Sequence, residues 1–457
     1  MTTARMTGES RSYRPVLLVL FAATLIYGVL FLGIAVAQEH IENRQRRDIF
    51  TLAVALAGIV AAFLSRKSWA KENRMMTWAA AGLPCYALLQ MIPLPLGLVG
   101  LLSPARAELV RSLEPLFGHR SWASLSIAPS ETFPHVLLFA TYCIVFLSVR
   151  RLSRQIQSWM VAFPVIVAGA VEAALGLAQF VVRADVQPRG TYGLRNHLAG
   201  LLEMALPLAA MYGIAELRAA RLGRNTAEGM ARAVAAFAVS ALILAGAFAT
   251  NSRGGFAGVL SSALAIFALT LGRDMTVGKR FAYAGVFFSI VVMALFLLTP
   301  ESLIERLSQH SSEGRVALWR ESLGVIREYP LVGCGLGGFE SAFQKFKASE
   351  GIFLVDYAHN DYIQYLAELG IAGFLLAATL IVLVMKRSLE IALDPSELRW
   401  LGLACFGSIA AILVHSVVDF NLYVPANAAV LAWICGIAAG LSPSAPRIVR
   451  RGGLAHE

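Results

Sequence analysis

The chain has 457 residues, of which 57% are hydrophobic and only 15% are charged. Soluble domains of this size carry about 25% charged residues, so the composition excludes an ordinary water-soluble protein. The net charge of +10 is spread over short loops. No basic tract is interleaved with stacking aromatic residues, which excludes a nucleic-acid-binding protein and suits anionic lipid headgroups better.

Long apolar runs recur along the whole chain, and each can cross the roughly 30 Å of hydrocarbon in a bilayer. We therefore predict an all-α polytopic membrane protein with about 12 transmembrane helices. The predicted spans lie near 15–37, 48–64, 76–97, 134–149, 156–182, 198–216, 233–250, 255–271, 281–299, 363–385, 400–418 and 425–441. The first ends in Ala35-Val36-Ala37, which resembles a signal-peptidase site. Its apolar core is longer than that of a signal peptide, so we expect it to stay uncleaved.

Arginine and lysine are concentrated in every second connection between these spans. Short basic loops stay in the cytoplasm, so this pattern places the N-terminus inside. The first connection disagrees, because Arg44, Arg46 and Arg47 would then lie outside. The long outer segment 300–362 is too polar to span. Within it, residues 315–328 place apolar side chains on one helical face, which predicts a helix on the membrane surface or over a cavity.

The five cysteines give no sign of a disulfide framework or a zinc site. Four of them lie inside apolar runs, their number is odd, and no Cys-x-x-Cys pair occurs. Cysteines in such positions are typically small apolar packing residues.

Ionisable side chains gather at the outer ends of the predicted spans. Such groups are costly in or beside hydrocarbon, so each is a functional-site candidate: Arg189, Arg195, His197, Glu203, Arg253, His359, Asp361, Glu368, His415 and Asp419. Anchoring at the interface would explain any one of these arginines, because span ends are the cheapest place for charge. The whole set on one side favours a site open to the outside over a path through the bilayer.

Two segments are suited to bind phosphate. Residues 187–200 form a glycine-rich loop that runs into a span, and the start of that helix directs amide groups and a positive dipole end outward. Residues 250–255 form a turn too short to hide Arg253. Guanidinium groups make forked hydrogen bonds to phosphate and stay charged at neutral pH. Two or three converging arginines would therefore hold a diphosphate without a metal ion.

A third segment, residues 357–373, carries a histidine suited to proton transfer. His359 precedes a helix that Asn360 or Asp361 can cap. Because the ordinary pKa of histidine is about 6.5, this side chain can take a proton from a sugar hydroxyl near neutral pH.

Other features favour structural interpretations. Residues 333–338 match GxGxxG but lack a strand–helix–strand context, so we interpret them as a flexible turn. His415 and Asp419, four residues apart on one helix, fit either a functional pair or a packing pair that satisfies itself. Glu172, the deepest carboxylate, is expected to be a buried hydrogen-bonding group more than a substrate contact.

Several of these segments together resemble the O-antigen ligase/polymerase family. The resemblance rests on His359-Asn-Asp-Tyr with Glu368-Leu-Gly-Ile-Ala-Gly373, on the run 314–338, and on motifs at 190–197, 252–255 and 415–426. These matches occur in order between about residues 185 and 430, whereas the first 180 residues match only in hydropathy. One position departs from the family pattern, because Leu194 stands where we expect an asparagine.

The resemblance implies a membrane-type glycosyltransferase fold with a periplasmic helical loop. Residues 183–441 would form the catalytic region, including the loop 300–362, between N-terminal helices in 1–182 and a cytoplasmic tail in 442–457. The implied reaction moves a glycan from undecaprenyl diphosphate to an acceptor sugar hydroxyl at the periplasmic face of the bacterial inner membrane. The implied partners are lipid A core or a growing glycan as acceptor, membrane lipids and a chain-length regulator. No metal ion, nucleotide or other cofactor is implied.

By the same resemblance, His359 would be the base that activates the acceptor hydroxyl. Arg189 and Arg253 would bind the diphosphate and stabilise its charge as it departs. The remaining candidates are expected to support the site: Arg195, His197, Glu203, Arg315, Arg320, Glu368, His415 and Asp419. Ligases and polymerases share these motifs, so the sequence leaves that choice open, together with the sugar and the acceptor.

Two functions of other classes stay open at this point. A flippase or exporter of lipid-linked oligosaccharide would need polar side chains on both sides of the membrane midplane, and the inner half of the spans is poor in them. A non-catalytic scaffold of a polysaccharide export complex would have little use for a histidine beside arginines.

Overall fold

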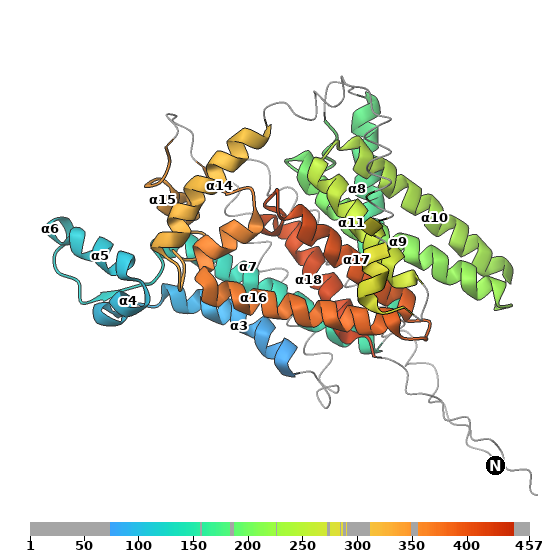
Figure 1. Cartoon of the computed structure of the whole chain (residues 1–457), viewed down its shortest axis with the longest axis horizontal. Coiled ribbons are helices and arrows are strands. Elements are labelled where there is room, and N and C mark those ends of the chain that lie inside the picture. Colours follow the sequence, from blue (N-terminus) through green and yellow to red (C-terminus); the bar gives the residue numbers. More distant parts are fainter. Residues whose placement is uncertain are drawn as a thin grey trace, which may run out of the picture.

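Six helices of the computed structural model are long and apolar enough to cross a membrane, counted over the described residues 74–155, 158–182, 187–224, 226–271, 275–283, 285–286, 289, 311–348 and 355–442. They are α7 (Pro129–Gln155), α8 (Phe163–Val182), α9 (Arg195–Arg221), α10 (Thr226–Ala249), α11 (Arg253–Thr270) and α16 (Asp361–Leu393). The turn η2 (Ser158–Val161) precedes α8. Two shorter apolar helices, α17 (Arg399–His415) and α18 (Pro425–Gly440), pack among them (Figure 1). The chain is therefore a multi-pass membrane protein.

Each of these eight helices overlaps a span predicted from hydropathy, between 134–149 and 425–441. The predicted spans 15–37 and 48–64, and most of 281–299, lie outside the described residues. The span predicted at 76–97 is wrong at its end. Helix α3 (Arg74–Met91) stops earlier because Pro93 and Pro95 follow it, and it is not apolar enough over 18 residues to be a candidate span.

Short elements cover the end of the bundle at which α3 ends and α16 begins, on the left of Figure 1. Strand β1 (Leu94–Pro95) pairs antiparallel with β2 (Trp122–Ala123), so the all-α expectation misses one small ladder. Helices α4 (Leu96–Leu102), α5 (Pro104–Ser112) and α6 (Glu114–Phe117) lie between these strands. Helix α14 (Ser311–Glu328) confirms the amphipathic helix predicted at 315–328. It packs against α16 and the short α15 (Phe339–Phe343).

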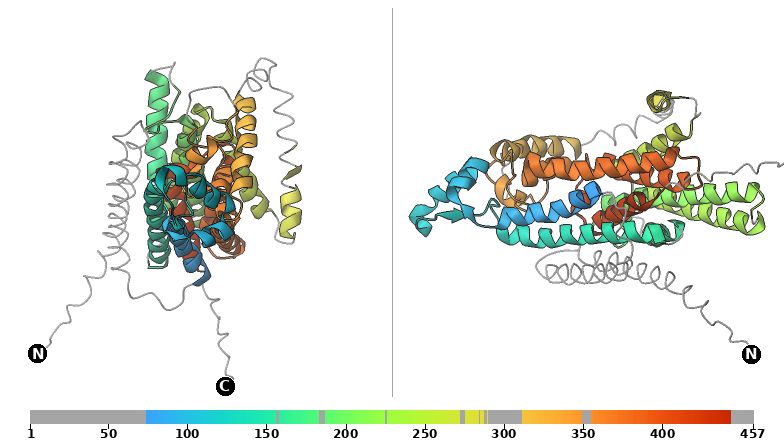
Figure 2. Two further views of the ribbon diagram at one scale, coloured as in Figure 1. Left: turned by 90° about the vertical axis from the view of Figure 1, so that its left-hand side faces the viewer. Right: turned by 90° about the horizontal axis from the view of Figure 1, so that it is seen from below.

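Helix α9 is the most buried of the candidate spans, and it contacts α8, α10, α11 and α17. Small residues let the helices approach closely, as is usual inside membranes. A Cβ added to Gly246 of α10 would lie 2.8 Å from the Cβ of Ala173, and one added to Gly169 of α8 would lie 2.5 Å from the Cβ of Ala205. On another side of the bundle, α3, α7 and α16 run beside one another (Figure 2).

Helix α16 is interrupted at Gly370, whose φ of 61° and ψ of −174° are not helical. Such a break frees backbone groups that must find partners away from water. The segment 330–335 supplies them. Ile371 N donates to the Pro330 carbonyl at 2.9 Å, and Cys334 N donates to the Ala367 carbonyl at 2.9 Å. Backbone groups on both sides of the break are therefore paired within the protein.

The turn at 333–338 is held in place by side chains from two helices, α16 and α3. Glu368 of α16 accepts from Gly337 N at 2.8 Å and from Phe339 N at 3.2 Å. Gln90 of α3 donates to the Val332 carbonyl at 2.7 Å. The interpretation of GxGxxG as a turn is confirmed. The turn is not flexible, however, because these bonds fix it in one conformation. We call this turn, residues 333–338, the clamp, because it holds the break in α16.

Replacing Gly333 with alanine is expected to unfold this clamp. Gly333 has a φ of +76°, and a Cβ there would lie 2.2 Å from the carbonyl oxygen of Glu368. Left-handed backbone and overpacking together are expected to cost about 3 kcal/mol or more. Unfolding of purified protein in detergent, followed by heating or titration with denaturant, measures the loss. Gly97→Ala is the matched control, because a Cβ at this helical position meets nothing within 4 Å.

Candidate active site

Three histidines from three parts of the chain surround the carboxylate of Asp419. A nitrogen of each ring lies near a carboxylate oxygen, at 4.0 Å for His197 Nε2, 3.8 Å for His359 Nδ1 and 3.9 Å for His415 Nε2. These three ring nitrogens and Asp419 Oδ2 are buried without a hydrogen-bond partner among the described residues. Buried polar atoms are usually paired, so four unpaired ones in one place are typical of a functional site.

Helix ends bring this histidine cluster (His197, His359, His415 and Asp419) together. His197 is in the first turn of α9, and His415 is the last residue of α17. The backbone N–H of Asp361, the first residue of α16, donates to the carbonyl of Ser416 at 2.9 Å and to that of Asp419 at 3.2 Å. These bonds fix the position of His359, two residues earlier, beside the turn that carries Asp419.

A fifth ionisable group, Glu203, orients the cluster through its contact with His415. Nδ1 of His415 lies 3.1 Å from both carboxylate oxygens of Glu203, and the two side chains are 1% and 0% exposed. Glycine makes room for this pair, because a Cβ at Gly258 would lie 2.2 Å from a Glu203 oxygen and one at Gly254 would lie 2.3 Å from the His415 ring. His415 is therefore held between the carboxylates of Glu203 and Asp419. The sequence left open whether His415 and Asp419 form a functional pair or a packing pair, and in the structure both residues belong to one buried network.

The carboxylate of Asp419 is kept ionised by its surroundings. Burial alone would raise the pKa of Asp419, but the interaction with His359, the nearby rings of His197 and His415, and the backbone N–H of Phe420 outweigh it. They hold the pKa of Asp419 below its usual range. The Phe420 N–H donates to Asp419 Oδ1 at 2.9 Å. An anionic Asp419 can stabilise an imidazolium that forms beside it.

His359 combines strained backbone with an accessible ring. Its φ is +50°. Among the described non-glycine residues, only Asn251 also has a positive φ. Strain of this kind persists where the surrounding structure fixes it and is frequent at active sites. The His359 side chain is 39% exposed, although its Nδ1 is buried toward Asp419. The ring packs edge-on against Phe420, with centroids 4.8 Å apart. The expectation that Asn360 caps α16 is confirmed, since its side chain accepts from Tyr362 N and Ile363 N.

Three arginines lie near one another at the same end of the bundle. Arg253 and Arg315 are close enough to Arg195 for their positive charges to act on it. Arg253 and Arg195 are the first residues of α11 and α9, whose free N–H groups add positive potential. Trp319, one turn after Arg315 on α14, donates its Nε1–H to the Ala358 carbonyl at 3.0 Å, directly before His359. This arginine group (Arg195, Arg253 and Arg315) therefore adjoins the histidine cluster.

The glycine-rich loop before α9 is anchored by the two polar residues of α8. Glu172 accepts from the N–H and the hydroxyl of Thr191, at 3.0 and 2.7 Å, which agrees with its expected role as a hydrogen-bonding group. Gln179 accepts from the backbone N–H of Arg189 at 3.0 Å. The Arg189 side chain itself is exposed. Its predicted contact with a diphosphate stays a prediction. Leu194 is the N-cap residue of α9 and offers no capping side chain.

Two further candidates lie apart from the histidine cluster. Glu368 is fully occupied, because it also accepts from Tyr423 at 2.6 Å and from Gln364 at 3.0 Å, beyond its bonds to the 333–338 turn. It supports the site through the turn and through η3 (Asn421–Tyr423), without facing the histidines. Arg320 is exposed on α14.

Several residues that join the site were not singled out in the sequence. Asn427 donates to the His197 carbonyl at 2.9 Å and to Asn421 Oδ1 at 3.0 Å, and it accepts from the hydroxyl of Tyr192 at 2.9 Å. Phe420 is stacked on Tyr357, with centroids 4.4 Å apart. A search for uncharged polar residues within apolar stretches would have found the asparagines. A search for charged residues does not detect them.

A comparison with known families finds a match in the second half of the chain. Residues 238–378 match the family model described as O-antigen ligase. This stretch is similar to the O-antigen ligase family. This match confirms the family predicted from the sequence motifs and supports a glycan-transfer role of the ligase or polymerase type. No match was found among curated proteins.

The O-antigen ligase match covers one part of the site. It spans the second half of α10, α11, α14, α15 and the first half of α16, and so includes Arg253, Arg315 and His359. His197, Glu203, His415 and Asp419 lie outside the matched residues, and Asp419 lies 3.8 Å from His359 within them. Among the described residues, no group of three or more His, Cys, Asp or Glu side chains is arranged to hold a metal ion.

Proposed function

We propose that the protein transfers a glycan from undecaprenyl diphosphate to a sugar hydroxyl at the periplasmic face of the bacterial inner membrane, without a metal ion. The observation that carries this proposal is an accessible histidine, His359, backed by the buried carboxylate of Asp419 and adjoined by three arginines. The acceptor is lipid A core or a growing glycan. Multi-pass helices with basic loops at the opposite end support the orientation.

In the proposed reaction, His359 acts as general base through Nε2, the ring nitrogen opposite the one that faces Asp419. It takes the proton of the acceptor hydroxyl, whose oxygen forms a bond to the anomeric carbon of the donor sugar. The bond from that carbon to the diphosphate oxygen breaks, and the electron pair leaves with the diphosphate. Asp419 stabilises the imidazolium that results, in the way that a carboxylate supports the histidine of other base–carboxylate pairs.

The arginine group is assigned to the diphosphate. Charge grows on the leaving oxygen as the glycosidic bond breaks, and fixed cations lower the energy of that state. Arg253 and Arg195 present guanidinium groups beside helix N-termini, which also favour anions. Arg315 comes from α14, the helix over this end of the bundle, and so links donor binding to the outer loop.

A transfer assay tests the proposal. Purified protein is mixed with undecaprenyl-diphosphate glycan and, in parallel reactions, lipid A core or a second lipid-linked repeat as acceptor. A new glycosidic bond should form in the presence of EDTA, and the acceptor that reacts separates ligase from polymerase. Movement of lipid-linked sugar across vesicles with no new bond would overturn the proposal and favour a flippase. Loss of product in EDTA that added metal restores would overturn metal independence.

Replacing Arg253 with alanine is expected to weaken donor binding about 10- to 100-fold, the range for a lost hydrogen bond to a charged group. Arg253→Lys should recover only part of this loss, since lysine keeps the charge but not the forked geometry. Binding of the lipid-linked donor to immobilised protein measures the effect. The control is Arg221→Ala, an exposed arginine at the other end of α9. Equal losses in both variants would contradict a specific diphosphate contact.

A further inference from the structure

A polar cavity of 330 Å³ lies at the end of the bundle opposite the histidine cluster. Its walls come from the start of α3, the last turn of α7, the last turns of α16 and the end of α18. The charged side chains that line it are Arg154, Lys386, Arg387 and Glu390. The sequence placed these residues in or beside inner loops. The structure instead extends α7 to Gln155 and α16 to Leu393, so the charges stand on helices around a cavity.

Two of the three cations in this cavity have no acidic partner among the described residues. Arg387 donates to the Leu441 carbonyl at 2.6 Å and to Glu390 at 3.0 Å, which engages the one carboxylate among the described lining residues. Within the described part of the chain, Arg154 and Lys386 have neither a carboxylate nor a hydrogen-bond partner, and Nε of Arg154 is buried. The cavity therefore has a net positive charge, and its donors match a phosphate group.

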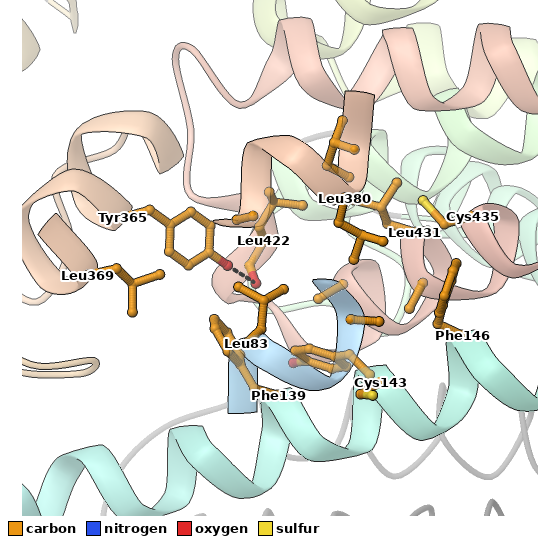
Figure 3. A pocket seen from close by; sticks show the side chains of 16 residues that line it. Leu83, Phe139, Cys143, Phe146, Tyr365, Leu369, Leu380, Leu422, Leu431 and Cys435 are labelled. Atoms are coloured by element: carbon orange, nitrogen blue, oxygen red, sulfur yellow. Dashed lines mark hydrogen bonds between the residues drawn. The ribbon is translucent and has the colours of Figure 1, made fainter. Parts of the chain in front are cut away.

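An apolar cavity of 150 Å³ lies between the same four helices, nearer to the histidine cluster (Figure 3). Phe146, Leu380 and Cys435 are among the side chains that line it. One of its polar groups, the hydroxyl of Tyr365, donates to the Leu422 carbonyl at 3.5 Å. An apolar cavity of about this size stays free of water and accepts apolar molecules. Hydrocarbon is thus its natural occupant.

The two cavities follow each other along one seam. On α3, Met76 lines the polar cavity and Ala80 the apolar one, and on α18 Ala439 and Cys435 stand in the same relation. Four residues of helix rise about 6 Å, so one turn separates the two linings. A molecule with a phosphate at one end and a hydrocarbon chain at the other matches this sequence of environments.

We propose that the seam between α3, α7, α16 and α18 binds one anionic glycerophospholipid. Its phosphate lies between Arg154 and Lys386, and one acyl chain occupies the apolar cavity. In the orientation set by the basic loops, the polar cavity faces the cytoplasmic leaflet, where anionic lipids are drawn to basic pockets between helices. Free phosphate would fill the polar cavity alone and leave the apolar one without an occupant.

Native mass spectrometry of delipidated protein in detergent tests this site. Phosphatidylglycerol should bind as one retained molecule per chain, whereas phosphatidylcholine and glycerol 3-phosphate should be lost. Arg154→Gln and Lys386→Gln should each weaken phosphatidylglycerol binding about tenfold, the effect of losing one charged hydrogen bond. Arg221→Gln, at an exposed arginine at the same end of the bundle, should leave binding unchanged. Ala432→Phe, which fills the apolar cavity, should weaken binding of long-chain lipid.

Other results would overturn the site. Equal retention by wild type and the Arg154→Gln/Lys386→Gln double variant would exclude the phosphate contact. Equal binding of phosphatidylglycerol and glycerol 3-phosphate, or an Ala432→Phe variant that binds like wild type, would exclude the acyl chain from the apolar cavity. Thermal unfolding in detergent without lipid checks that each variant is folded. No step of glycan transfer enters these measurements, so their outcome is independent of the proposed reaction.

Discussion

Replacing His359 with alanine is expected to lower the rate of glycan transfer about a thousandfold while leaving donor binding within about twofold, in the range for loss of a general base. The physical reason is the position of the ring, which is 39% exposed and faces the carboxylate of Asp419 through Nδ1. Without it, no described side chain in that place can take the proton of the acceptor hydroxyl. Single-turnover transfer and donor binding, measured on the same preparation, separate the two effects.

His119→Ala is the matched control for this prediction. His119 is also exposed, at 74% of its side chain, but it lies beyond α6, where it forms an ion pair with Glu114. Its replacement should change neither the transfer rate nor donor binding. A His359→Ala enzyme with wild-type turnover would end the assignment of the base. A variant that loses donor binding as strongly as turnover would place His359 in binding instead.

Replacing Glu203 with alanine is expected to destabilise the protein by about 3–5 kcal/mol, the cost of breaking a buried charged pair on one side only. Glu203 and His415 are 0% and 1% exposed and lie 3.1 Å apart. Removal of the carboxylate leaves the imidazole without its partner in the core of the bundle. Glu203→Gln keeps the size and one acceptor oxygen, so it should cost clearly less. Unfolding in mixed micelles gives both values.

The same helix provides the control for Glu203. Glu216, four turns further along α9, pairs with Arg232 at 2.9 Å, but these side chains are 20% and 38% exposed. Exposed pairs contribute about 0–1 kcal/mol, so Glu216→Ala should be nearly silent. Similar losses for Glu203→Ala and Glu216→Ala would contradict the buried pair and, with it, the fixed position of His415 in the cluster.

Hydropathy was enough to predict the membrane helices because each span must hide its own backbone in hydrocarbon. The predicted span 425–441 corresponds to α18 almost residue for residue, and the predicted span 198–216 lies within α9, which extends beyond it at both ends. Hydropathy failed where prolines or distant hydrogen-bond partners determine the course of a helix. Helix α3 stops at Met91 because prolines follow, and the break at Gly370 depends on carbonyl and N–H groups supplied from residues 330–335. A pattern of apolar residues carries no trace of such distant partners.

For the site, the search for ionisable residues found the histidine cluster and the arginine group but not their arrangement. Charge at a span end is visible in the sequence, whereas the meeting of His197, His359 and His415 at one carboxylate depends on how the helix ends converge. The same limit explains Glu368. It resembles its neighbours as a costly carboxylate, yet its oxygens are bound to the 333–338 turn and to Tyr423.

The break in α16 at Gly370 also affects the depth at which His359 lies in the membrane. The part of α16 from Ile371 to Leu393 would extend roughly 34 Å at 1.5 Å per residue, which is enough to cross the hydrocarbon on its own. The preceding segment of about two and a half turns, from Asp361 to Leu369, is then not needed for the crossing. It forms a separate unit that can hold His359 in the headgroup layer. In the proposed reaction, an acceptor sugar would then reach His359 without entering the hydrocarbon.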